Sequence, residues 1–278
     1  MKTILKAPPS HPVMFNGIFD DGEIMSSFLN STGLFSIEDP NTLSFLKQSF
    51  EEGIDVLTPV MDLRVAIGKS SILDVEMQNI KPHYDMNFRL GYYLSKLIGK
   101  SQVKGKKYES KECVVIAVLN FTMYDDDKYL RTFMFKDEWN ITIPYFKIIA
   151  LELTKISYCD KNKLKKWMEF LNSKEPQSLI GDDTLDYTMD KAFEKAIKRA
   201  IELNADDKLV QLLDSYEKFE RENASFYEAG KAEGKIEGKI EGKIEEKIEI
   251  AKKLKSMGIS VEQIVLGTGL TAQEVEKL

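Results

Sequence analysis

Two acidic residues and an amide at close spacing could bind a metal ion. Asp62, Glu76 and Gln78 lie in two β-rich runs, 61–67 and 72–78, around a Gly/Ser turn. This pattern predicts a β-hairpin, and Glu76 and Gln78, two residues apart, would share one face of their strand. Converging carboxylates need a cation or a proton, and Mg²⁺ prefers oxygen ligands. The alternative is an ordinary solvated strand face.

The pairing register of this hairpin decides whether Asp62 can join the other two. Residues directly across an antiparallel pair share a face. Asp62 therefore shares a face with Glu76 and Gln78 only if paired positions sum to an even number, which needs a three- or five-residue connection. A connection that pairs 67 with 72 would turn Asp62 to the other face unless a bulge corrected it. Asp74 would lie on the same face as Glu76 and could assist.

The elements that must position these residues follow from the hydrophobic pattern. Proline at 8, 9 and 12 predicts an irregular start over 1–20. The spacing of apolar residues then predicts helices and strands in this order: helices at 22–31 and 41–51, the hairpin, a helix at 85–100, strands at 114–120, 129–135 and 146–153, and helices at 163–171, 190–204 and 207–223. We therefore expect a mixed α/β core followed by a helical tail.

Composition excludes several classes of protein. Two cysteines, Cys113 and Cys159, do not make a thiolate metal site, and we expect them to be buried. Two histidines, His11 and His83, argue against a histidine zinc centre, so any metal must bind carboxylates. No apolar run is long enough for a membrane span, and the N-terminus does not have the apolar core of a signal peptide. A cytoplasmic protein without a membrane partner is expected.

Local charge contrasts with the net charge of −6. Between Lys81 and Lys111 there are eight basic and two acidic residues, a balance of +6. Such a segment is either a nucleic-acid-binding surface or a solvated helix and loop.

The C-terminal segment repeats a four-residue unit, Gly-Lys-Ile-Glu, over 230–250. On a helix this spacing makes an isoleucine ridge flanked by lysine and glutamate rows, although glycines weaken the helix. The segment could self-associate or act as a semi-rigid spacer. Two capping-box patterns at 260 and 271 then predict short helices at 261–266 and 272–278. We interpret them as a packing hairpin rather than a DNA-reading motif, because the second is acidic.

Several segments together resemble a known family. They are ILDVEMQ at 72–78, FRLGYYLSKL at 88–97, KGKKY at 104–108, VVIAVLNF at 114–121 and FKIIALELTK at 146–155. They are similar to the Rpn family of recombination-promoting nucleases and transposases, within the PD-(D/E)XK nuclease superfamily. The resemblance covers about residues 13–155, and a similar repeat tail recurs in such proteins.

The resemblance implies a restriction-endonuclease-like fold and a DNA endonuclease that uses Mg²⁺ or another divalent cation. Asp62 and Glu76 would bind the metal, with Gln78 as the third catalytic residue where many members have lysine; an amide can orient water but supplies no charge. The residues that would contact the DNA backbone are Arg89, Lys96, Lys100, Lys104, Lys106 and Lys107. Arg89 could instead pair with a carboxylate, and Tyr92 and Tyr93 are expected in or beside the core rather than as base-stacking groups.

The chain departs from the family near its start. Family members open with an Asp-x-x-Phe-Lys pattern, and here Pro12 and Asn16 stand at the acid and lysine positions. The alternative function is therefore an inactive DNA-binding or oligomerising protein with the nuclease fold. We predict a nuclease-like core over 1–155, a helical extension over 156–225, and a repeat helix with a terminal helical hairpin over 226–278. That last segment is where a homo-oligomer could form.

Overall fold

A computed structural model of the protein describes residues 3–46, 63–101, 110–179 and 190–278. The chain divides into two compact units, Met1–Tyr216 and Glu217–Leu278. The 50-residue helix α6 (Asp207–Ser256) belongs to both. The segments predicted as helices at 163–171 and 190–204 lie in the first unit, and their apolar residues join its main core.

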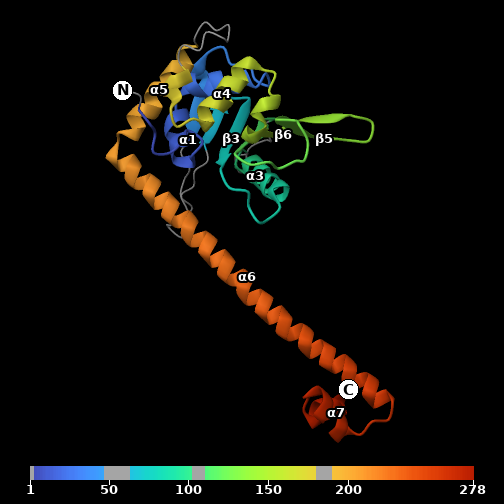
Figure 1. Cartoon of the computed structure of the whole chain (residues 1–278). Helices are drawn as coiled ribbons and strands as arrows, with labels where there is room; N and C mark the ends of the chain where they lie inside the picture. Colours follow the sequence, from blue (N-terminus) through green and yellow to red (C-terminus); the bar gives the residue numbers. More distant parts are fainter. Residues whose placement is uncertain (1–2, 47–62, 102–109, 180–189) are drawn as a thin grey trace. The chain divides into compact units, whose positions relative to one another are not determined.

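A six-stranded mixed sheet forms the centre of the first unit (Figure 1). Its strands, in spatial order, are β1 (Leu43–Leu46), β2 (Leu63–Ile67), β3 (Ser71–Gln78), β4 (Glu112–Leu119), β6 (Thr142–Glu152) and β5 (Leu130–Lys136). β3, β4 and β6 are mutually parallel, whereas β1, β2 and β5 pair antiparallel with their neighbours. β4 is apolar on both faces because helices cover both sides of a parallel strand.

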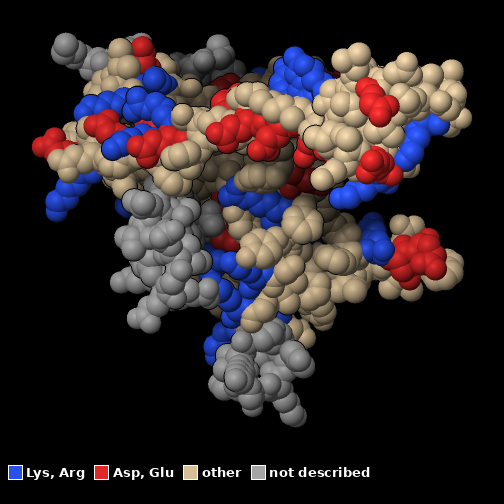
Figure 2. All heavy atoms as spheres, turned by 90° about the horizontal axis from the view of Figure 1, so that it is seen from below, with Lys and Arg blue, Asp and Glu red and all other residues tan. Residues whose placement is uncertain are grey.

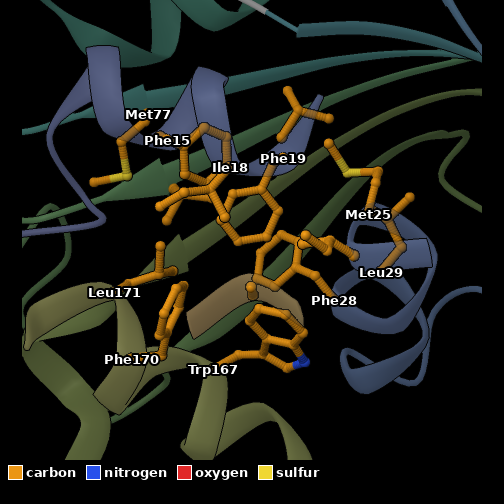
Figure 3. Close-up of a cluster of buried hydrophobic side chains, with 14 of the residues drawn as sticks. Phe15, Ile18, Phe19, Met25, Phe28, Leu29, Met77, Trp167, Phe170 and Leu171 are labelled. Carbon is orange, nitrogen blue, oxygen red and sulfur yellow. The ribbon is translucent and has the colours of Figure 1, made fainter. Parts of the chain in front are cut away.

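Helices cover the two faces of this sheet unequally. On one face, odd-numbered residues of β3 pack with α1 (Pro12–Phe19), α2 (Gly22–Ser31), α4 (Asn162–Asn172) and α5 (Lys191–Asn204) in the larger core. Figure 3 shows part of it, where Phe19, Phe28 and Trp167 meet. On the other face, α3 (Met86–Ser101) packs through Leu90, Leu94 and Leu97 in a second core. This is the predicted restriction-endonuclease-like α/β fold with flanking helices.

Most predicted elements are confirmed within a few residues, but two expectations near the N-terminus are wrong. Residues 12–19 form helix α1, not an irregular segment. Proline is tolerated at the first helical position, where its missing N–H costs no bond, and His11 Nδ1 accepts the N–H of Val13. Residues 43–46, expected to be helical, form strand β1 because they pair antiparallel with β2. Residues 47–51 of that predicted helix lie outside the described residues.

The second unit is helical. The predicted helix at 207–223 and the repeat at 230–250 form one continuous helix, α6. α7 (Val261–Thr268) and α8 (Ala272–Lys277) follow, and Ile264, Leu270 and Val275 pack with Ala251 of α6. The two terminal helices therefore pack together against the end of α6. Among the described residues, none of the helices combines the length and apolarity that crossing a membrane requires.

Candidate functional site

Glu76 and Gln78 lie on one face of β3, as the two-residue period predicts. The Gln78 amide donates a hydrogen bond from Nε2 to Oε2 of Glu76 at 3.4 Å. Glu76 is fully buried and Gln78 is half-buried. In the neighbouring strands Glu76 is level with Ala117 and then Ala150, two small side chains on the face that α3 covers. A carboxylate and an amide are thus placed together beneath α3.

Asp74 shares this face but has a partner of its own. Its Oδ1 lies 3.6 Å from Nε of Arg64, the residue directly opposite on β2. Burial raises the pKa of Asp74, and the positive charges of Arg64 and Lys100 offset only part of that effect. Asp74 is therefore a cross-strand ion-pair residue in this structure, next to the Glu76–Gln78 pair.

The hairpin register meets the condition derived from the sequence. Leu63 pairs with Val75 and Ile67 with Ser71, so paired positions sum to an even number and the connection has three residues. Gly68, at φ 55°, begins that connection in the left-handed region that glycine adopts freely. Asp62 itself lies outside the described residues. Within the described ranges, no three His, Cys, Asp or Glu side chains group together as a metal site.

The predicted DNA-binding residues of α3 are at the surface. Lys96 and Lys100 are exposed, and Arg89 is half-buried. Arg89 donates from Nε to the Tyr93 hydroxyl at 2.6 Å. Lys104, Lys106 and Lys107 lie outside the described residues. Figure 2 shows Lys and Arg atoms gathered near the middle of the face seen from below, beside uncharged side chains.

The two tyrosines of α3 differ from each other. Tyr93 packs at the edge of the second core, as expected. Tyr92 is 49% exposed, so the expectation that it belongs to the core or its edge is wrong. Leucines at 90, 94 and 97 already fill the buried face of α3, which turns Tyr92 toward solvent.

Sequence reasoning did not single out a buried ion pair at the end of β6. Glu152 is level with Gln78 across β4. Its Oε1 accepts a bond from Lys155 Nζ at 3.0 Å, and its Oε2 accepts the Met123 N–H at 2.7 Å. Lys155 also donates to the Tyr124 carbonyl at 2.8 Å. The sequence signal for this pair is a glutamate and a lysine three residues apart at the end of an apolar strand. The pair fixes the segment between β4 and β5.

A mixed sheet flanked by helices, with a Glu-x-Gln pair on β3, one of its two central strands, agrees with the nuclease fold of the PD-(D/E)XK type. The model of the PD-(D/E)XK nuclease family transposases matches residues 14–230, and the chain belongs to this family. The match confirms the family resemblance predicted from the sequence. Comparison with curated proteins gave no match, and neither did comparison with solved structures.

Proposed function

We propose that this protein is an endonuclease that hydrolyses DNA phosphodiester bonds with a divalent metal ion. The observation that carries the proposal is the fully buried Glu76 carboxylate with the Gln78 amide beside it, on the central strand of a nuclease-family fold. Carboxylate and amide oxygens are the ligands that divalent ions such as Mg²⁺ prefer.

The residues present fit a divalent ion such as Mg²⁺. Glu76 supplies a carboxylate oxygen, and the even register of β2 and β3 supports Asp62 as the second carboxylate on the same face. A bound ion would lower the pKa of a water molecule and stabilise charge on the phosphodiester. Gln78 would orient that water by hydrogen bonds. Its amide is already held toward Glu76 at 3.4 Å.

DNA is the proposed partner, and α3 supplies the cations that would bind it. Arg89, Lys96 and Lys100 would contact phosphates without reading sequence. Lys104, Lys106 and Lys107 follow in the sequence and would extend that contact. α3 packs on the sheet face that carries Glu76, so these contacts would lie near the proposed metal ligands.

Plasmid cleavage tests the proposal. The wild-type chain should nick supercoiled DNA with Mg²⁺ or Mn²⁺ and not with EDTA. Glu76→Gln and Asp62→Ala should each lower the nicking rate by more than about a hundredfold. Substituting a residue that only orients a metal ligand typically costs about 10- to 100-fold. Asp74→Asn is the matched control, because Asp74 is also buried on the same face of β3 but pairs with Arg64. Nicking that survives both Glu76→Gln and Asp62→Ala would reject the site.

The alternative function is DNA binding without cleavage. Pro12 and Asn16 stand where family members have an acid and a lysine, and Asn16 lies in α1. Wild-type protein that binds DNA but does not nick it with either metal ion would favour this alternative.

Self-association through the C-terminal helix is a separate proposal. Ile236, Ile240 and Ile244 form an exposed row on α6, at the four-residue spacing of the repeat. Pairing this row with a second copy would bury it. Light scattering should give a larger mass for the full chain than for an Ile236→Ser, Ile240→Ser, Ile244→Ser variant. Equal masses would rule this proposal out.

A further inference from the structure

A row of aromatic side chains lies on the exposed side of α3 and just before it. Tyr84, Phe88 and Tyr92 follow one another at four-residue spacing and are 52%, 78% and 49% exposed. Four-residue spacing places side chains on one face of a helix, which here applies to Phe88 and Tyr92. The buried face of α3 is filled by leucines instead. The aromatic row is therefore not needed to pack this helix on the sheet.

Cations accompany these rings. The Arg89 guanidinium carbon lies 5.4 Å from the centroid of the Tyr84 ring, and Lys96 Nζ lies 4.9 Å from that of Tyr92. α3 itself carries one arginine, two lysines and no Asp or Glu. The surface thus combines aromatic faces with a net positive charge, because Asp85, beside Tyr84, is its one acid against Arg89, Lys96 and Lys100 within residues 84–101. That combination complements a ligand made of flat rings and phosphates.

We propose that Tyr84, Phe88 and Tyr92 form a stacking platform for unpaired bases of single-stranded DNA. The proposal rests on the proposed function and names its substrate class: DNA with a single-stranded stretch. Proteins that bind single strands pair a positively charged track with aromatic side chains on which bases stack. Here Phe88 is the most exposed ring and the main stacking residue, while Arg89, Lys96 and Lys100 contact the phosphates.

The spacing of the rings favours a single strand over a duplex. Phe88 and Tyr92 are separated by about 6 Å along the helix axis. Bases in a duplex repeat every 3.4 Å or so, and their faces are covered by the bases above and below. An extended single strand has wider steps and free base faces. Phe88 and Tyr92 also belong to the helix whose other side packs on the sheet face that carries Glu76.

Fluorescence anisotropy with the full chain in EDTA tests the platform without cleavage. The probes are a fluorescein-labelled oligothymidylate, an abasic strand of equal length, and a duplex of that length. The abasic strand keeps the phosphates but offers no bases to stack. Wild-type protein should bind the oligothymidylate tighter than either of the others. Phe88→Ala should weaken binding to the oligothymidylate about fivefold or more and leave the abasic strand nearly unchanged.

Two further variants separate stacking from other causes. Phe226→Ala is the matched control, because Phe226 is also a helical phenylalanine and is 77% exposed, on α6. It should leave all three affinities unchanged. Phe88→Trp should restore binding to the oligothymidylate. Three results would each overturn the platform. Phe88→Ala could lose equal affinity for the oligothymidylate and the abasic strand, or it could bind both as wild type does. The third is a wild-type protein that does not bind the oligothymidylate.

The two proposals fail separately. Binding in EDTA does not depend on a metal ion, so it is measured separately from cleavage. A protein that stacks bases but never nicks DNA would refute the proposed function and keep the platform. A protein that nicks DNA, but whose binding to the oligothymidylate does not depend on Phe88, would refute the platform and keep the proposed function.

Discussion

The buried pair Glu152–Lys155 gives a sharp prediction about what holds the segment between β4 and β5. Both side chains are at most 5% exposed, and their charged atoms lie 3.0 Å apart. Lys155→Met would leave the Glu152 carboxylate buried without this cation. Removing one partner of a buried ion pair typically costs about 3–5 kcal/mol. A domain is stable by about 5–15 kcal/mol, so this loss would be a large fraction of the total.

Removing the Glu152 carboxylate instead of the Lys155 ammonium should lower the free energy of unfolding by less. In Glu152→Gln the amide oxygen can still accept the Met123 N–H, and Lys155 keeps its bond to the Tyr124 carbonyl. A hydrogen bond to a charged group contributes about 1.5–3 kcal/mol, which sets the expected loss. In the double variant no buried charge remains without its partner. It should be less destabilised than the sum of the single variants, by up to about 3 kcal/mol.

Urea unfolding measures these differences as a change in the free energy of unfolding. Trp167, which is 2% exposed in the main core, is the fluorescent reporter, with Trp139→Phe as the common background. Lys155→Met within about 1 kcal/mol of the background protein, or strictly additive losses in the double variant, would refute the reasoning.

Three more predictions concern the helices on the opposite face of the sheet. Asp21 caps α2 by accepting the N–H groups of Glu23 and Ile24 and pairs with Lys195 at 2.8 Å. Asp21→Ala should lower the free energy of unfolding in urea by about 1–2 kcal/mol. Asp21→Asn keeps the cap and loses the partly exposed ion pairs with Lys195 and Arg199, at a cost of about 0.5 kcal/mol. Equal losses in the two variants would exclude capping. Burial raises the pKa of Asp21, but the bonds from Lys195 and the backbone outweigh it and hold the pKa below 3.8. The ionised group therefore stabilises the fold above pH 3.8, and the gap in unfolding free energy between wild type and Asp21→Asn should close as pH falls below that value; a gap independent of pH would contradict this. Phe28→Ala, at a fully buried ring, should lower the free energy of unfolding by about 3–5 kcal/mol, and a loss under 1 kcal/mol would show that the core closes around the gap.

Local sequence signals were sufficient for the elements that surround the site. The alternation of the hairpin and its glycine turn predicted β2 and β3, and the apolar run at 114–120 predicted β4, because each pattern reflects burial of its own strand. β1 was missed because residues 43–46 are a strand only through pairing with β2, a contact that local periodicity does not contain. α1 differs from the expectation because Pro12 stands at the first position of the helix, where proline is a start signal and does not block the helix.

The site was predictable where it depended on the two-residue period and not where it depended on packing. Glu76 and Gln78 were expected on one face and share it. The exposed aromatic row was not expected, because apolar residues at helical spacing look alike whichever stripe meets the sheet. The leucines of α3 face the sheet, and only the tertiary contacts determine which apolar stripe of the helix does so.

Binding of Mn²⁺, followed by its electron paramagnetic resonance signal, tests the central claim most directly. Wild type and Asp74→Asn should both bind the ion, and Glu76→Gln should not. The two substitutions remove one negative charge each from buried carboxyls on the same strand face, so a general charge effect would weaken both equally. Wild-type affinity in Glu76→Gln would contradict the proposed metal site.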